Sequence, residues 1–213
     1  MERLKRTANG DPIVTLPMTR CPIITAALLL ACANPLWAKN PPVSLREGDA
    51  APVFSGVDDK GNEWNSSDYI GRNVVVVYFY PADMTSVCTR QACSFRDQSE
   101  ELGQAGIKVV GVSGDSVKNH QLFKKAHSLN FPLLADVDGS IAKAFGVPVR
   151  DGGEITRVVD GKQKKLVRGV TARRWTFVIG LDGTIMNRNT DVQAATDGKS
   201  VLKLVRHLTA SAQ

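Results

Sequence analysis

Two cysteines five positions apart, Cys88 and Cys93, are the side chains of this sequence best suited to chemistry. Cys88 lies where a run of β-branched and aromatic residues at 74–80 gives way, after Pro81, to the amphipathic pattern of a helix over 86–104. The first turn of a helix carries unpaired backbone N–H groups and the positive end of the helix dipole, which lower the pKa of a thiol placed there. We therefore predict that Cys88 is a thiolate nucleophile.

The spacing of its neighbours strengthens this interpretation of Cys88. Pro81 precedes it by seven residues and Thr85 by three. Taken singly, the proline ends a strand, the threonine caps a helix, and a lone cysteine is usually a buried small hydrophobe. Together, Pro-x-x-x-Thr-x-x-Cys resembles the peroxidatic motif of the peroxiredoxins, and Cys93 resembles the second cysteine of their peroxiredoxin Q, or bacterioferritin comigratory protein, branch. The resemblance covers roughly residues 44–210.

This resemblance implies a thiol peroxidase of the two-cysteine type that uses no cofactor. Cys88 would attack a hydroperoxide and become a sulfenic acid, Cys93 would condense with it to a disulfide, and a thioredoxin-like dithiol protein would reduce that disulfide. The expected substrates are hydrogen peroxide and small organic hydroperoxides. In such a site Pro81 would shield the thiolate, and the hydroxyl of Thr85 would bond to the sulfur or to a peroxide oxygen.

The family also places an arginine before a strand, and the matching pattern here is Arg-x-Thr-Phe-Val-Ile at 174–179. By itself, an arginine before a strand is more often a solvated side chain. The resemblance implies that Arg174, not Arg173, lowers the pKa of Cys88 and donates hydrogen bonds to oxygen as the O–O bond breaks. One departure is Gln91, where the branch commonly has glutamate: the amide keeps the hydrogen-bonding shape but loses the charge that would steer Arg174.

The spacing of Cys88 and Cys93 constrains how they can meet. Five residues of helix give a rise of about 7.5 Å and a rotation of about 140°, so the two Cα atoms lie roughly 8 to 9 Å apart. A disulfide requires an approach to within about 7 Å. We therefore predict that the helix opens between the two cysteines during turnover.

Strand and helix patterns alternate along the rest of the chain. In chain order we expect a strand at 107–113, a helix at 117–129, a strand at 131–135 and a short helix at 141–145. A two-stranded hairpin at 175–187 and a closing helix around 201–208 complete the pattern. The segment 151–170 is expected to be a loop or hairpin, because glycine turns bracket a β-branched run. The alternation indicates an α/β fold, and the resemblance makes it thioredoxin-like, with a central mixed β-sheet flanked by helices.

Size and composition fit one globular domain behind a removable leader. The 213 residues, 43% of them hydrophobic, can bury a sizeable core without a metal. We assign residues 1–38 to the leader and 39–213 to the thioredoxin-like domain.

The leader is expected from an apolar run at 21–33, which suits the core of a signal peptide and is too short to span a bilayer. Translation would then start at Met18, and cleavage would follow Ala38. A competing interpretation makes Cys32 the lipidated cysteine of a lipoprotein. Either way we expect an exported protein of the periplasm or cell envelope, which contacts a membrane only if Cys32 carries lipid.

Other partners have little support in the sequence. The 27 Lys and Arg residues exceed the 21 Asp and Glu, but the basic stretch at 162–174 lacks interleaved aromatic residues and resembles a solvated hairpin, so we expect no nucleic acid. His120, His127 and His207 have no metal-ligand spacing with a cysteine and are interpreted as surface or helix-end residues, so we expect no metal. The expected assembly is a monomer or a weak dimer.

Two other functions share parts of this pattern. A thiol-disulfide oxidoreductase of the same fold would normally use Cys-x-x-Cys, whereas four residues, 89–92, separate the cysteines here. A holdase or structural partner protein would not depend on Cys88, and no feature of the sequence supports it.

Overall fold

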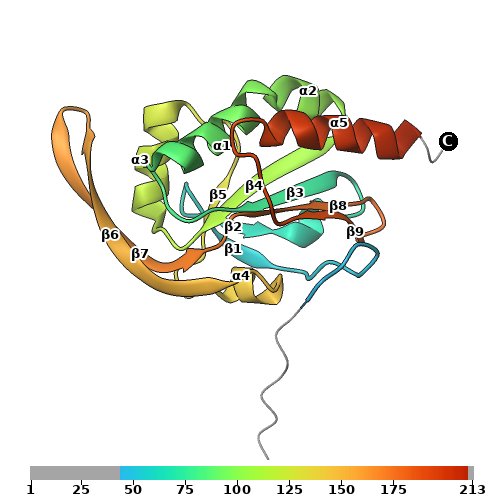
Figure 1. The fold of residues 1–213 in the computed structure, drawn as a ribbon, viewed down its shortest axis with the longest axis horizontal. Coiled ribbons are helices and arrows are strands. Elements are labelled where there is room, and N and C mark those ends of the chain that lie inside the picture. Colours follow the sequence, from blue (N-terminus) through green and yellow to red (C-terminus); the bar gives the residue numbers. More distant parts are fainter. Residues whose placement is uncertain (1–43, 211–213) are drawn as a thin grey trace, which may run out of the picture. The chain divides into compact units, whose positions relative to one another are not determined.

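The computed structural model describes residues 44–210, which are built on a seven-stranded mixed sheet (Figure 1). Its strands are β1 (Ser55–Asp58), β2 (Glu63–Asn65), β3 (Val74–Phe79), β4 (Ile107–Ser113), β5 (Leu133–Ala135), β8 (Trp175–Ile179) and β9 (Ile185–Asn189). Their spatial order is β2-β1-β5-β4-β3-β8-β9. The neighbours β3, β4 and β5 run parallel, and all other pairs in the sheet are antiparallel.

Helices cover both faces of this sheet (Figure 1). One face carries α1 (Ser86–Asp97), α2 (Ser99–Gln104), α3 (Val117–His127) and α5 (Asp197–Ala210). The other face carries the short helix α4 (Ser140–Ala144), and a single 3-10 turn, η1 (Ser66–Asp68), follows β2. The prediction of an α/β domain with a central mixed sheet flanked by helices is confirmed.

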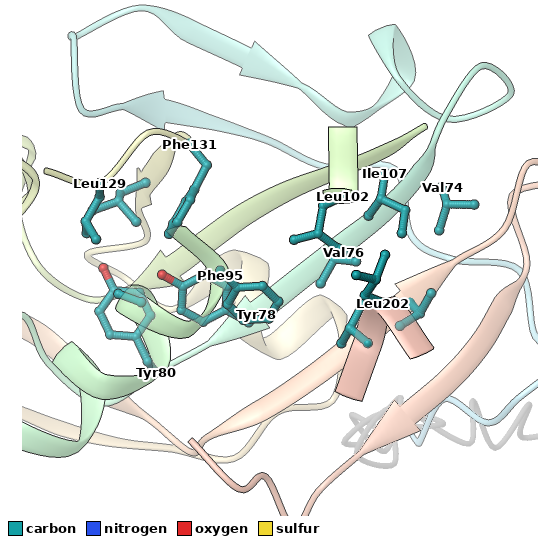
Figure 2. Packing of buried hydrophobic residues seen from close by; sticks show 14 of the residues in the cluster. Val74, Val76, Tyr78, Tyr80, Phe95, Leu102, Ile107, Leu129, Phe131 and Leu202 are labelled. Atoms are coloured by element: carbon teal, nitrogen blue, oxygen red, sulfur yellow. The ribbon is translucent and has the colours of Figure 1, made fainter. Parts of the chain in front are cut away.

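The central strand β3 explains why its sequence is an unbroken apolar run. Every residue of β3 is buried, because successive side chains point to opposite faces and helices cover both. Val76 and Tyr78 join the core beneath α1 and α5, where Tyr78 stacks on Phe95 with the ring centroids 4.9 Å apart (Figure 2). Val77 and Phe79 join the core on the opposite face, around α4.

The segment expected to be a loop or hairpin is a long hairpin, formed by β6 (Val149–Val159) and β7 (Lys162–Ala172). Its two-residue turn consists of Asp160 and Gly161, whose φ angles of 51° and 72° match the turn type that suits the twist of paired strands. The hairpin forms a separate two-stranded sheet and extends away from the seven-stranded sheet as an arm (Figure 1).

The prediction of one continuous helix over 86–104 is wrong. The helix breaks at Gln98, whose φ of −101° and ψ of 6° leave the helical region, so α1 and α2 are two separate helices. The backbone N–H of Gln98 bonds to the carbonyls of Phe95 and Arg96, and this tightened last turn ends α1. Apolar periodicity does not register the break, because Leu102 of α2 returns to the same core.

The predicted leader cannot be compared with this fold. Residues 1–38, with the proposed start at Met18, cleavage after Ala38 and lipidation at Cys32, lie outside the described residues. Within 44–210, none of the helices has the length and apolar character needed to cross a membrane.

The contact of α1 with the sheet can be tested at Phe95, which is fully buried against Tyr78. Substitution Phe95→Ala leaves a cavity and should lower the free energy of unfolding by about 3 to 5 kcal/mol, measured by urea denaturation. Val87 lies on the same helix and is 40% exposed, so Val87→Ala should change the free energy of unfolding by less than about 0.5 kcal/mol. Equal effects of the two substitutions would contradict this account of the core.

Candidate active site

Cys88 lies in the first turn of α1, as the sequence predicts. The helix begins at Ser86, and its N-cap residue Thr85 has the extended backbone, φ −89° and ψ 146°, that such a position requires. The chain reaches it directly from β3 through the loop 80–85. Cys88 is 2% exposed and is a free thiol. The sulfur is therefore shielded from bulk water and close to the positive end of a helix.

Arg174 is the residue that the structure brings to Cys88. Its Nη2 atom donates a hydrogen bond to the Sγ atom at 3.1 Å. The register of the sheet explains this contact: Phe79, the last residue of β3, pairs with Trp175, the first residue of β8, so Arg174 lies beside the start of the loop that leads to α1. A guanidinium at this distance stabilises a thiolate more than a thiol.

Gln91 holds the other side of the same guanidinium. One turn after Cys88 and fully buried, its Oε1 atom accepts a hydrogen bond from Nη1 of Arg174. Its Nε2 atom donates to Oδ2 of Asp197 at 2.8 Å and lies 3.5 Å from Oγ1 of Thr176. The amide of Gln91 thus forms the contact with Arg174. The carboxylate that this amide contacts belongs to Asp197, which the sequence alone did not identify as a site residue.

Thr85 and Pro81 flank the sulfur with less direct contacts. The hydroxyl of Thr85 donates to the carbonyl of Ala82 at 3.1 Å, so its predicted bond to sulfur or peroxide stays a prediction. Pro81 is half-buried and, with Arg174, borders a groove of about 440 Å³. The groove therefore borders two of the predicted site residues.

Cys93 is half-buried and is also a free thiol. It lies in the same unbroken helix as Cys88, since α1 continues to Asp97. Helical geometry keeps two residues of this spacing beyond disulfide distance. The structure therefore represents the dithiol form of the pair, and the opening of the helix stays a prediction.

A buried polar network supports the loop before α1. Asp83 is fully buried; it accepts a hydrogen bond from the Tyr80 hydroxyl at 2.8 Å, and its other oxygen lies 2.8 Å from Nδ1 of His120. Its backbone N–H donates to Asp115 at 2.9 Å. These contacts tie the loop to the end of β4 and to α3.

The same network corrects the interpretation of His120 as a surface or helix-end residue, which is wrong. His120 is fully buried on the inner side of α3. Burial lowers its pKa, but the nearby Asp83 carboxylate more than offsets this, so the pKa of His120 is raised. The sequence around His120 does not reveal its burial, because the carboxylate that stabilises it, Asp83, lies 37 residues away in the chain.

The arm contacts the same loop from outside. Met84 has a left-handed backbone, with φ 59°, and its carbonyl accepts a hydrogen bond from Nε of Arg157 at 3.0 Å. Left-handed geometry is unfavourable for a residue with a side chain. The arm therefore helps to stabilise a strained turn one residue before the N-cap of α1.

Comparison with known sequences identifies relatives of this chain. Residues 47–188 match the model of the AhpC/TSA family. A chloroplastic peroxiredoxin Q of Oryza sativa is 48% identical over 102 residues, which are 48% of this chain and 46% of the rice protein, so the match spans about half of that relative. A Coxiella burnetii protein named peroxiredoxin bcp is 39% identical over 143 residues, which are 67% of this chain and 87% of that protein.

Solved structures agree with the sequence relatives. Peroxidoxin BcpB of Mycobacterium tuberculosis aligns with a TM-score of 0.64 at 30% identity, covering 78% of this chain and 99% of that one. A cysteine-to-serine mutant of PrxQ from Xylella fastidiosa aligns with a TM-score of 0.65 at 26% identity, covering 80% and 99%. The shared architecture confirms the predicted thioredoxin-like fold.

The pair of His120 and Asp83 predicts a pH dependence of stability. Because the pKa of His120 is raised in the folded state, its protonation stabilises the fold fully below its unfolded value of about 6.5, and this stabilisation is lost as the pH rises through the folded value. In urea denaturation, the difference in unfolding free energy between the unmodified protein and His120→Gln should shrink from acidic to alkaline pH. His207→Gln, at an exposed position of α5, is the control. A difference that stays constant or grows with pH would contradict the assignment.

Proposed function

The chain belongs to the AhpC/TSA family, and on that premise we propose that it is a thiol peroxidase that reduces hydrogen peroxide and organic hydroperoxides with Cys88. The observation that carries the proposal is the 3.1 Å contact of Arg174 with the Cys88 sulfur in the first turn of α1. This arrangement supports the proposal, because it puts the nucleophile at the start of a helix with guanidinium hydrogen-bond donors beside its sulfur.

In the first step the thiolate of Cys88 attacks the terminal oxygen of the hydroperoxide. A sulfur–oxygen bond forms as the oxygen–oxygen bond breaks, and its electron pair leaves with the second oxygen, which takes up a proton as water or alcohol. Cys88 is oxidised to a sulfenic acid. Arg174, fixed on one side by Gln91, donates hydrogen bonds to the oxygens as charge moves from sulfur to oxygen.

In the second step Cys93 resolves the sulfenic acid. Its thiol sulfur bonds to the sulfur of Cys88, and the hydroxyl group leaves as water. Because α1 keeps the two residues too far apart, the turn between them must unwind first. Unwinding withdraws Gln91 from its buried contacts, so oxidation disassembles the site that performed the first step.

In the third step an external dithiol restores both cysteines. One of its thiolates attacks the disulfide, and its second thiol displaces the resulting mixed disulfide, leaving Cys88 and Cys93 reduced and the donor oxidised. A thioredoxin-like protein has the required pair of thiols. Opening of α1 would expose the disulfide to such a partner.

Export to the periplasm or cell envelope remains part of the proposal. Its basis is the signal-like apolar run at 21–33 and the use of only two cysteines, Cys88 and Cys93, after residue 38. A disulfide-forming cycle is compatible with an oxidising compartment, provided that a dedicated reductant is present.

The cycle predicts distinct losses for the two cysteines. Mixing the reduced domain with one equivalent of hydrogen peroxide should consume the peroxide rapidly with loss of two thiols. Cys88→Ser should abolish consumption, whereas Cys93→Ser should still consume one equivalent but stop at the sulfenic acid and lose steady-state activity with a dithiol protein reductant. Peroxide and free thiols are measured together by stopped flow and thiol titration.

Other results would redirect the assignment. Slow peroxide loss that does not depend on Cys88, combined with disulfide exchange activity, would favour a thiol-disulfide oxidoreductase. Full steady-state activity of Cys93→Ser would remove Cys93 from the cycle and leave the peroxidase assignment to Cys88 alone.

The role of Arg174 predicts that lysine cannot replace it. The guanidinium contacts Gln91 and Cys88 through two different nitrogens, which a single ammonium group cannot reproduce in the same plane. Arg174→Lys should lower the second-order rate constant for peroxide by about 100-fold or more, the usual cost of removing one fixed donor. Arg188→Lys, at a half-buried arginine of β9, is the matched control and should keep the rate. A rate within about threefold of the unmodified protein, about 0.7 kcal/mol, would exclude this role.

A further inference from the structure

Asp197 is a buried carboxylate that the catalytic cycle described above leaves without a task. It is the first residue of α5 and is 2% exposed. Its Oδ2 atom accepts hydrogen bonds from Nε2 of Gln91 at 2.8 Å and from the hydroxyl of Thr176 at 2.7 Å. Burying a carboxylate costs free energy unless hydrogen bonds stabilise it, so the role of these two hydrogen bonds has to be explained.

The contacts of Asp197 determine which way the amide of Gln91 points. The guanidinium of Arg174 only donates hydrogen bonds, and an ionised carboxylate only accepts them. An amide between these groups satisfies both in one orientation, with oxygen toward Arg174 and nitrogen toward Asp197. The reverse orientation would place donor against donor and acceptor against acceptor, and each buried mismatch is unfavourable.

Thr176 and Gly198 hold Asp197 in place. Thr176 lies on β8 two residues after Arg174, so its hydroxyl ties the carboxylate to the strand that also positions the guanidinium. Gly198 lets α5 approach α1 closely: a Cβ there would lie 2.4 Å from the carbonyl oxygen of Ser94. Its backbone N–H also donates to the Ser94 hydroxyl at 2.8 Å. The start of α5 is therefore held against both α1 and β8.

We propose that Asp197 is a positioning residue, which fixes the amide of Gln91 and through it aims the guanidinium of Arg174 at Cys88. The proposal rests on the peroxidase function given above. It also gives the uncharged amide of Gln91 a carboxylate partner at the start of α5, with the amide as the link between Asp197 and Arg174.

The electrostatic surroundings of Asp197 agree with this role. Burial raises the pKa of Asp197, and the hydrogen bonds from Gln91 and Thr176 and the positive charge of Arg174 offset only part of this rise. The only charged side chain among these influences is the guanidinium that Asp197 is proposed to position.

A charge transposition tests the proposal. In Asp197→Asn the new amide can present either oxygen or nitrogen to Gln91, so only the mismatch at Arg174 still opposes the reverse orientation of Gln91 and its preferred orientation is weakened. In the double variant Gln91→Glu/Asp197→Asn, the carboxylate accepts directly from Arg174, and the nitrogen of the asparagine donates to that carboxylate. The order of donors and acceptors is again unique, with the charge on the other helix.

Three readouts are compared: the stopped-flow rate constant for oxidation of Cys88 by hydrogen peroxide, the pH profile of that rate, and the thermal midpoint. Asp197→Asn should lower the rate about tenfold, the loss expected when a charge-assisted hydrogen bond is disturbed, and should change the pH profile of that rate. The double variant should recover the rate to within about threefold of the unmodified protein and return the pH profile. A residue that served stability alone would not be rescued in this way.

Asp136→Asn is the matched control. Asp136 is also a buried aspartate near a helix start: it lies before α4, on the opposite face, and accepts hydrogen bonds from the backbone N–H groups of Ile141 and Ala142 in that helix. Its loss should lower the thermal midpoint and leave the oxidation rate unchanged.

The outcomes separate this proposal from the general function. An unchanged rate in Asp197→Asn, or a double variant no faster than Asp197→Asn, would overturn the positioning role while the unmodified protein remains a peroxidase. An unmodified protein that does not consume peroxide through Cys88 would overturn both.

Discussion

The hydrogen bond between Arg174 and the sulfur of Cys88 is the interaction on which the candidate active site depends. It joins residues 86 positions apart, so the fold must bring the residue before β8 to the beginning of α1. The antiparallel pairing of β3 and β8 does this, because it places the start of one strand beside the end of the other. A shift of this register by one residue would turn every side chain of β8 to the other face of the sheet. The apolar residues of the two cores therefore also secure the geometry of the site.

In the proposed cycle, the helix that carries Cys88 must meet two opposing requirements. Attack on a peroxide needs an intact first turn of α1, with Gln91 buried against Arg174, whereas a disulfide with Cys93 needs that turn to unwind. The contacts that hold α1 differ between its later part and the segment between the cysteines. Phe95 and Leu102 hold the later part of α1 and α2 in the core, while the segment between the cysteines is held by the polar contacts of Gln91 and by the small buried side chain of Ala92. Hydrogen bonds can be exchanged for water at a smaller cost than a packed aromatic ring can be exposed.

The loop before α1 has its own supports, which do not include the segment that unwinds. Asp83 is bound to Tyr80, His120 and Asp115, and Met84 is bound from outside by Arg157 of the arm. These contacts involve β4, α3 and β6, so they can persist while α1 opens. In the proposed cycle these contacts would keep the loop before Cys88 in position while the following turn unwinds.

The local sequence pattern was sufficient to predict many elements of this fold. The buried strand, the helix start just before Cys88 and the hairpin of β8 and β9 follow from neighbouring residues, because dihedral preferences and side-chain periodicity act over a few positions. Arg174 was found through the family resemblance, since an arginine before a strand has no local property that marks it as functional. The break at Gln98, the burial of His120 and the contact of Asp197 with Gln91 were decided by the tertiary structure alone. Asp197 and Gln91 lie 106 residues apart, and only the order of strands and the packing of α5 on α1 decide which distant carboxylate meets which buried amide.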